Sequence, residues 1–469
     1  MLKNGSSIVL AALATVPGGG PWRTARAQEA QPQRHSSDSL ATAEGGPVKR
    51  GDVPSRVVHL ADVERSAAAQ QPQILVARAA TSGAQGQQEQ ARSPLLPQVT
   101  ASTTYTRETA NLVVRPGAFF PANYVPPAVS LTTSYDFWTF GIGATQLIYD
   151  FGQTWEKYKA ARSNVDAERN AERTTTLQVV FAVRRAYFNA RAGKDLVGVA
   201  LETLDDQKKH LQQVQGFVTV GTQPLVALAQ QKAAVANAQV GFITAQNNYE
   251  TAKAQLDQAA GLAIGTDYDL GDEDLPPVEE EDQPLETLAA TAIAGRPEIA
   301  TLAKQREAQE ATLRAARGGY GPAFSANASA NEQGTALDGL VPNWAAGLAV
   351  NWPVFQGGLT SGQVRQAQAG IESVDAQRSL EELQIRLDVD SARLAVKAAK
   401  ATISAAEDAE ASAREQLRLA EQRYATGVGS IIELNDAQVA FTSSAAQLVQ
   451  ARYSLASARA QLLAALGRT

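Results

Sequence analysis

The chain of 469 residues contains no cysteine, and its three histidines (His35, His59 and His210) are far apart. The absence of cysteine excludes a disulfide scaffold, a thiolate metal site, a cysteine nucleophile and lipid attachment to an N-terminal cysteine. No constellation of histidines or paired acids repeats or clusters in the sequence. We therefore expect no metal site, no cofactor and no catalytic residue, and we predict that the protein is not an enzyme.

Aromatic residues make up only 6% of the sequence, and the 20 prolines are confined to clusters. No proline occurs between Pro127 and Pro224, or in the 116 residues after Pro353. Because proline breaks a helix interior and alanine favours helix, these alanine-rich stretches predict long helices. No run of 18 apolar residues is present, which argues against a membrane-spanning helix. The net charge of −6 offers no basic surface for nucleic acid.

The first residues have the pattern of a secretory signal peptide. Lys3 precedes an apolar segment, Ile8–Val16, and small residues at Ala25 and Ala27 mark a cleavage site. We expect residues 1–27 to be removed and the protein to function outside the cytoplasm. Residues 28–56 are polar and rich in proline and glycine, which predicts a disordered N-terminal arm.

The rest of the chain contains two similar copies of one pattern. Glycines that follow similar segments recur 206 residues apart: Gly152 and Gly358, Gly221 and Gly427, and Gly261 and Gly467. Near the start of each copy the separation is 225 residues, so the first copy has 19 extra residues, in a proline-rich loop between Tyr105 and Phe140. We predict a first repeat at residues 57–266, an acidic, solvated linker at 267–286 and a second repeat at 287–469.

Each copy is predicted to contain a helix, two strands joined by a loop, a very long helix and a returning helix. In the second strand of each copy, apolar residues alternate with small or polar ones, as in the wall of a barrel. The residues assigned to this wall are Phe140, Ile142, Leu348, Val350 and Trp352. An ordinary half-buried sheet is the alternative interpretation. Each long helix lies within a 69-residue interval between glycines and should contain about 60 residues.

The turns that follow the two long helices carry a resemblance to a known family. Val218–Leu225 and Tyr424–Gln438 resemble the hairpin ends of TolC-like outer-membrane efflux proteins, and the motifs LIYDFG and WPVFQGG resemble the strand-to-helix junctions of that family. The similarity extends over residues 57–467 in the correct order. It implies a mainly α-helical chain with a membrane β-barrel, in which a homotrimer forms a 12-stranded β-barrel and a periplasmic α-helical barrel.

The resemblance also implies a function and a set of partners. Such a trimer is the outer-membrane channel of a tripartite efflux system, and it conducts small molecules passively from the periplasm to the exterior. The implied partners are a periplasmic adaptor (membrane fusion) protein, an inner-membrane pump of the RND or ABC type and outer-membrane lipid. The implied location is the cell outer membrane, extending into the periplasm. Two alternatives stay open: the exit duct of type I protein secretion, and an extended structural or adhesive coiled-coil protein.

The resemblance locates a narrow periplasmic entrance, or gate, at the second turn. Glu433 and Asp436 match two acidic positions that ring this entrance in similar proteins, and Tyr424 matches a third position whose carboxylate partner is missing here. Threefold symmetry would create six carboxylates and a cation-selective gate. The structural alternative is that acids in a first helical turn stabilise the helix dipole. Where the family has an acid and a base that help to hold the entrance closed, this chain has Ala227 and Gly429, so we expect a looser closure.

Both turns are also expected to contact the adaptor. The docking residues are Val220, Gly221, Thr222, Gly427, Val428 and Gly429. Glycine is favoured wherever the backbone adopts a left-handed conformation, so turn geometry alone is the alternative explanation for Gly221 and Gly427.

Overall fold

The computed structural model of the protein describes four segments: residues 56–109, 134–265, 268–273 and 275–468. The predicted signal peptide, the N-terminal arm up to residue 55 and most of the proline-rich insert lie outside these residues. Arg56, which the sequence assigns to the disordered arm, instead begins a strand that is paired with another part of the chain. Among the described helices, none is both long enough and apolar enough to cross a membrane.

The described residues form long helices, one larger sheet and one pair of short strands. The first half contains β1 (Arg56–Val58), α1 (Leu60–Gln70), α2 (Pro72–Arg92), the 3₁₀ turn η1 (Ser93–Leu95), β2 (Gln98–Thr109), β3 (Ser134–Tyr149), α3 (Gln153–Thr219) and α4 (Leu225–Ala260). The second half contains β4 (Tyr268–Leu270), α5 (Leu285–Gly295), α6 (Pro297–Gly318), β5 (Ala323–Gly334), β6 (Val341–Asn351), α7 (Leu359–Ala425) and α8 (Ile431–Ala465).

The helical segment before each pair of strands is broken in two. The breaks occur at Pro72 and Pro297, and the preceding residues, Gln71 and Arg296, have extended backbones. A proline ring disfavours the helical conformation in the residue before it, which explains both breaks. The sequence predicts a single helix at each place, which is wrong. The long helices α3 and α7 contain 67 residues each rather than the expected number of about 60, so at 1.5 Å per residue each is about 100 Å long.

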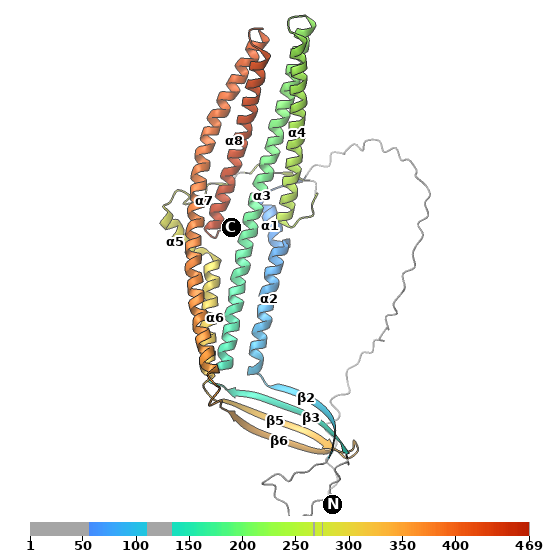
Figure 1. The fold of residues 1–469 in the computed structure, drawn as a ribbon, viewed down its shortest axis with the longest axis vertical. Coiled ribbons are helices and arrows are strands. Elements are labelled where there is room, and N and C mark those ends of the chain that lie inside the picture. The colour runs from blue at the N-terminus through green and yellow to red at the C-terminus, as the bar shows by residue number, and fades with distance from the viewer. Residues whose placement is uncertain (1–55, 110–133, 266–267, 274, 469) are drawn as a thin grey trace, which may run out of the picture. The chain divides into compact units, whose positions relative to one another are not determined.

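The helices lie side by side in one layer (Figure 1). In the half nearer the larger sheet, the order across the layer is α2, α3, α6 and α7; in the other half it is α4, α3, α8 and α7. Only α3 and α7 run through both halves. Among the described elements, α7 therefore forms one edge of the layer, with α5 packed against part of it, while α2 and α4 form the other edge.

The larger sheet is antiparallel, in the order β2, β3, β5 and β6. Because cross-strand partners lie on the same face, the register divides the side chains into two sets. One face is mainly apolar and includes Val99, Tyr105, Trp138, Phe140, Ile142, Phe324, Trp344, Leu348 and Val350. The other face is small or polar and includes Ser102, Thr104, Gly141, Gly143, Asn327, Asn331, Gly347 and Asn351. Strands β2 and β6 are the edges and have no second partner strand among the described residues.

The stretch predicted to be a solvated linker is packed against helices of both halves, at a level that we call the waist. Strand β4 pairs in parallel with β1, and its residues Tyr268 and Leu270 are buried. The side chain of Glu281 is 6% exposed. It accepts hydrogen bonds from Arg459 of α8, and its Oε1 lies 2.7 Å from Nζ of Lys400 in α7. The expectation of a solvated linker is therefore wrong for these residues, because the acids have basic partners on α7 and α8.

Candidate functional site at the hairpin ends

The turn between α3 and α4 contains a glycine in the left-handed conformation. Gly221 has a φ of +76°, and the amide of Thr222 donates to the carbonyl of Phe217 at 2.9 Å. Glycine commonly ends a helix in this way, because it has no Cβ to oppose a positive φ. Val220 is 71% exposed and presents its side chain to solvent at the end of the hairpin.

The turn between α7 and α8 is built in the same way but is tighter. Gly427 has a φ of +77°, and the amides of Val428 and Gly429 both donate to the carbonyl of Arg423, at 3.0 and 2.9 Å. A Cβ on Gly429 would lie 2.9 Å from the backbone nitrogen of Tyr424, so any other residue would force the turn to shift. The basic residue that the resemblance leads one to expect at position 429 does not fit this turn.

The two predicted gate acids lie in the first two turns of α8 and have different surroundings. Ser430 caps the helix, because its hydroxyl accepts a hydrogen bond from the backbone nitrogen of Glu433 at 3.1 Å. The Glu433 carboxylate lies 3.3 Å from Nε of Arg423 in α7. Asp436 is exposed and forms no ion pair within the described part of the chain. The capping hydrogen bond uses the backbone of Glu433 and neither carboxylate, so the Asp436 carboxylate and the Glu433 carboxylate, the latter beside Arg423, are both available to act at an opening.

Tyr424, the third predicted gate residue, is buried between the hairpins. It is 1% exposed, and its ring meets the ring of Phe217 edge to face, with centroids 5.7 Å apart. Burial raises the pKa of its hydroxyl. Ala227 is 2% exposed and belongs to the same apolar cluster, which also contains residues of α3, α7 and α8. The resemblance predicts an acid at position 227. In this chain the residue is alanine, and it packs in the apolar cluster instead of forming an ionic contact.

One contact between the hairpins could not be found by inspecting sequence motifs. His210 of α3 is buried, and its Nε2 lies 3.2 Å from Oε1 of Glu421 in α7. The two residues are 211 positions apart. Nothing in the sequence around His210 indicates this partner, because the two residues meet only when α3 and α7 are both in place.

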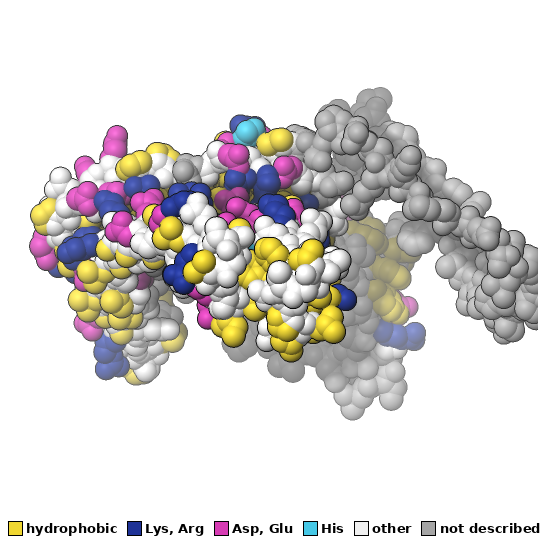
Figure 2. Space-filling model, turned by 90° about the horizontal axis from the view of Figure 1, so that it is seen from above, with side chains coloured by type: hydrophobic (Ala, Val, Ile, Leu, Met, Phe, Trp, Pro, Cys, Tyr) yellow, Lys and Arg dark blue, Asp and Glu magenta, His cyan; other side chains and the backbone are white. Residues whose placement is uncertain are grey.

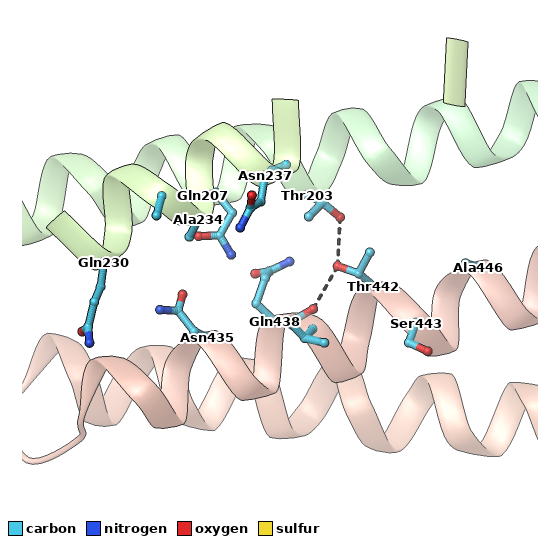
Figure 3. A pocket seen from close by; sticks show the side chains of 13 residues that line it. Thr203, Gln207, Gln230, Ala234, Asn237, Asn435, Gln438, Thr442, Ser443 and Ala446 are labelled. Atoms are coloured by element: carbon cyan, nitrogen blue, oxygen red, sulfur yellow. Dashed lines mark hydrogen bonds between the residues drawn. The ribbon is translucent and has the colours of Figure 1, made fainter. Parts of the chain in front are cut away.

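A groove of about 620 Å³ lies between α4 and α8, and Thr203 and Gln207 of α3 also line it (Figure 3). Amide side chains of Gln207, Asn237 and Asn435 surround Gln438, which is 1% exposed and whose two amide atoms have no hydrogen-bond partner in the described structure. The hydroxyls of Thr203 and Thr442 are hydrogen bonded across the groove at 2.9 Å. Glutamine recurs along all four long helices, so nothing in the sequence singles out this group.

Charged side chains of both signs are interspersed on the face seen when the hairpin ends point toward the viewer (Figure 2). Many are paired along the helices, as are Lys209 with Asp206 and Arg418 with Glu415. The electrostatic potential around the hairpin ends therefore has no single dominant sign. The negative charges of Glu433 and Asp436 can act only on ions that come close to them.

Four of the five residues assigned to the barrel wall lie on the apolar face of the sheet: Phe140, Ile142, Leu348 and Val350. Leu348 is 79% exposed and Val350 is 61% exposed, so no described element of the single chain covers this part of the face. Trp352 follows the last residue of β6 and lies outside the strand. Its indole donates a hydrogen bond to the carbonyl of Tyr320 at 3.1 Å.

The chain combines two long helical hairpins with a sheet that has one exposed apolar face. Known proteins share this combination. A sequence profile described as "Outer membrane efflux protein" matches residues 64–262 and 288–468. The chain belongs to this family. It is an efflux protein of the outer membrane that extends into the periplasm. The alternative of a structural or adhesive coiled coil required a chain without barrel strands, and the four-stranded sheet contradicts it.

Relatives in this efflux family are distant in sequence but similar in extent. Outer membrane protein TolC of Escherichia coli is 22% identical over 427 residues, which cover 88% of this chain and 83% of TolC. Outer membrane efflux protein BepC of Brucella suis is 25% identical over 335 residues, which cover 70% of this chain and 72% of BepC.

Solved structures of outer membrane channels share the fold. The CmeC outer membrane channel of Campylobacter jejuni superimposes with a TM-score of 0.75 and 19% identity, covering 87% of this chain and 85% of CmeC. The outer membrane protein VceC of Vibrio cholerae gives a TM-score of 0.73 and 19% identity, covering 87% of this chain and 96% of VceC.

Proposed function

We propose that three copies of this chain close into one passive conduit, the exit duct of a tripartite efflux system, with no catalytic group. The observation that carries this proposal is the four-stranded sheet, which has an exposed apolar face and whose edges, β2 and β6, have no further partner strand among the described residues. Unpaired backbone groups in lipid cost several kcal/mol each, so such a sheet is stable in a membrane only when it is closed. Pairing β6 of one copy with β2 of the next gives a homotrimer with a 12-stranded β-barrel whose polar face lines the channel.

The helical layer has matching open edges. Exposed leucines follow one side of α7 at helical spacing: Leu380, Leu383, Leu387 and Leu394. The facing edge offered by α2 carries exposed Leu75 and Val76. We infer that α7 of one copy packs against α2 and α4 of the next, because closure of the layer into a periplasmic α-helical barrel removes these apolar side chains from water.

The order of elements supports the proposed duplication. Each half contains two helices, two adjacent strands of the sheet, a 67-residue helix and a returning helix of 36 or 35 residues. We propose that these are tandem repeats at residues 57–266 and 287–469, joined at the waist by residues 267–286. In this arrangement, each repeat contributes half of the strands and one hairpin to the conduit.

The hairpin ends are proposed as both gate and docking surface. In a trimer, Glu433 and Asp436 from three chains would surround the periplasmic opening. Tyr424 was expected to line it as well, but its side chain is 1% exposed and packs between the hairpins instead. The exposed turn residues would meet a periplasmic adaptor, which connects the conduit to an inner-membrane pump of the RND or ABC type. Relatives named for toluene and antibiotic efflux pumps favour small molecules as cargo over the proteins of a type I secretion system.

Two alanines on opposite faces of β6 test the barrel. Ala346 pairs with Ala328 on the apolar face, and Ala345 pairs with Ser329 on the polar face; both are exposed in the single chain. A charge on a lipid-facing position near the middle of a membrane strand costs about 2–4 kcal/mol. Ala346→Arg should therefore prevent assembly of the membrane trimer, whereas Ala345→Arg should assemble and shift the selectivity of the channel toward anions in planar bilayers. Equal tolerance of the two changes, or loss of the Ala345→Arg trimer alone, contradicts the proposal.

A further inference from the structure

A cavity of about 440 Å³ lies where α6 ends beside the start of α3, at the end of the helices that joins the sheet. We call it the junction cavity and define it by its lining residues: Phe151, Arg314, Arg317, Gly318, Tyr320 and Gly321. It is at the opposite end of α3 from the hairpin turn, so neither the proposed gate nor the docking surface uses it.

Phe151 forms one wall of the junction cavity, and the backbone is shaped to hold it there. Its φ is +54°, an uncommon conformation for a residue with a side chain. A Cβ on Gly321 would overlap the Phe151 ring, so the absence of a side chain at 321 allows the ring to pack on the backbone. The chain thus tolerates an unfavourable backbone angle in order to fix an aromatic wall at this place.

The junction cavity lies on the apolar side of the sheet. Tyr149 pairs with Phe324 and Phe324 pairs with Val350, so these side chains share the apolar face. The ring of Phe151 continues the row, because its centroid is 5.1 Å from that of Tyr149. Aromatic side chains gather where a membrane meets water. Given the proposed insertion of the sheet in the membrane, the cavity is at the level of the lipid headgroups on the periplasmic side.

The charge at this level is opposite to that of the whole chain. The segments of the helices nearest the sheet contain seven basic and three acidic residues, although the chain has a net charge of −6; these segments are 86–92, 150–162, 311–320 and 359–368. Nε of Arg314 lies 2.8 Å from Oε2 of Glu156, which partly neutralises it. Arg317 is exposed and forms no ion pair among the described residues. Positive charge is therefore left unpaired beside the cavity.

We propose that the junction cavity binds the phosphate group of a glycerophospholipid from the periplasm-facing leaflet of the outer membrane. Arg314 and Arg317 are neighbours on one side of α6, at i and i+3, and their guanidinium groups match the oxygens of a phosphate. The rings of Phe151 and Tyr320 form an apolar surface for the glycerol and the first acyl carbons. The helix dipole alone favours an arginine in the last turn of α6, but it requires neither a cavity nor an aromatic wall.

Lipid retention by the purified full-length trimer tests this proposal. Native mass spectrometry in the presence of increasing dioleoyl phosphatidylglycerol should reveal one tightly bound lipid per chain. Arg314→Gln with Arg317→Gln should weaken this binding by at least about tenfold, because hydrogen bonds from charged donors to phosphate are lost. The matched control is Arg306→Gln with Arg386→Gln, two partly exposed arginines paired with acids outside the cavity, and it should bind lipid as the unmodified protein does.

Two results would overturn the lipid site: equal binding by the Arg314→Gln, Arg317→Gln variant and the unmodified protein, or an equal loss in the control. Displacement of the lipid by excess inorganic phosphate would identify a general anion site and would also overturn it. If the double variant fails to assemble, Arg317→Gln alone answers the question, because Arg317 has no ion pair to lose.

Channel recordings on the same preparations separate this proposal from the proposed conduit. Conducting trimers whose lipid binding is unaffected by the arginine changes reject the lipid site alone. Absence of conductance from the unmodified protein in planar bilayers rejects the conduit itself.

Discussion

The imidazole Nε2 of His210 in α3 lies 3.2 Å from Oε1 of Glu421 in α7. Among the described residues, it is the only contact between a basic and an acidic side chain that links the α3–α4 hairpin to the α7–α8 hairpin. The His210 side chain is 4% exposed, and its Nδ1 has no hydrogen-bond partner. Among the described residues, Glu421 is therefore the one hydrogen-bond partner of the buried His210 ring, which lies between the two hairpins.

Replacement of Glu421 by alanine should loosen the junction between the hairpins. The His210 ring would keep no partner on either nitrogen, and an unpaired buried polar group costs about 1–3 kcal/mol. The chain lacks cysteine, so spin labels can be attached at Val220→Cys and Val428→Cys, one on each turn. Double electron–electron resonance should show a broader distribution of distances between the labels in the Glu421→Ala protein.

Glu415 provides the control for this measurement. It lies on the same helix, but its partner is Arg418 of the same helix, so Glu415→Ala removes an ion pair without touching the junction. Unchanged distances in the Glu421→Ala protein would mean that the apolar cluster around Tyr424 holds the hairpins by itself. Equal broadening in both variants would mean that the broadening does not arise from the contact between His210 and Glu421.

Neutralising the two gate acids should reduce cation selectivity. In a trimer, Glu433→Gln with Asp436→Asn would remove six negative charges from the opening. Reversal potentials measured in a salt gradient should move toward the non-selective value, and block by divalent cations should weaken. Glu407→Gln with Asp408→Asn removes the same charge from exposed positions of α7 far from the turn and should change neither property. Full selectivity in the Glu433→Gln, Asp436→Asn trimer would leave stabilisation of the helix dipole as the role of these acids.

Removal of the base beside Glu433 should have the opposite effect. Nε of Arg423 lies 3.3 Å from the Glu433 carboxylate and reduces its negative potential. Arg423→Gln keeps the backbone carbonyl that accepts the turn hydrogen bonds, but it leaves the carboxylate unpaired. The reversal potential should therefore shift toward stronger cation selectivity than in the unmodified channel. An unchanged reversal potential would place this pair away from the conduction path, and a shift toward anions would contradict the prediction.

Features that depend on local geometry could be predicted from the sequence. Gly221 and Gly427 were expected to form left-handed turns, and both have positive φ. The alternation that begins at Phe140 predicted one apolar face in β3, and the register agrees because side chains of a strand point alternately to its two faces. Such patterns are visible in sequence because each involves residues only a few positions apart.

Features that depend on contacts between distant segments were missed. The acids of the linker looked solvated, since nothing near Glu281 in the sequence indicates that Arg459 and Lys400 surround it. The pairing of His210 with Glu421 likewise arises only when α3 and α7 are brought together. A charged residue has the same local pattern whether its partner is water or another helix, so its burial could not be inferred.

Acid should weaken the waist through Glu281. Burial alone would raise the pKa of this carboxyl, but hydrogen bonds from Lys400, Arg459 and the backbone of Val278 outweigh it and lower the pKa. A lowered pKa in the folded state adds stability above the unfolded pKa, near 4.5, and this stability is lost as the pH falls through the folded value. The melting temperature of the trimer should therefore fall more steeply below pH 4.5 than that of a Glu281→Gln variant.

At neutral pH the Glu281→Gln variant should also be less stable, by about 2 kcal/mol, because hydrogen bonds to a charged acceptor are lost. Glu279→Gln removes an exposed acid two residues away and should leave both the stability and its pH dependence unchanged. Equal acid sensitivity of the Glu281→Gln trimer and the unmodified trimer would assign the acid loss to other carboxylates.

Charges at the two turns should weaken docking of the adaptor while the channel stays folded. Val220 and Val428 are 71% and 75% exposed, so Val220→Glu with Val428→Glu disturbs no packed residue of the chain. Burial of a valine side chain at an interface contributes about 1.5 kcal/mol or more, so affinity for the adaptor should fall by at least about tenfold. Surface plasmon resonance with the purified adaptor and the immobilised trimer measures this affinity directly.

The control adds the same charge at positions away from the turns. Leu201→Glu with Ile264→Glu changes residues that are 44% and 71% exposed, in α3 and near the waist. This control should bind the adaptor with unchanged affinity, and both variants should still assemble into conducting trimers, because all four changes are made at exposed side chains. Unchanged adaptor affinity in the Val220→Glu, Val428→Glu trimer would move the docking surface away from the turn residues, and the glycines beside them would then serve turn geometry alone.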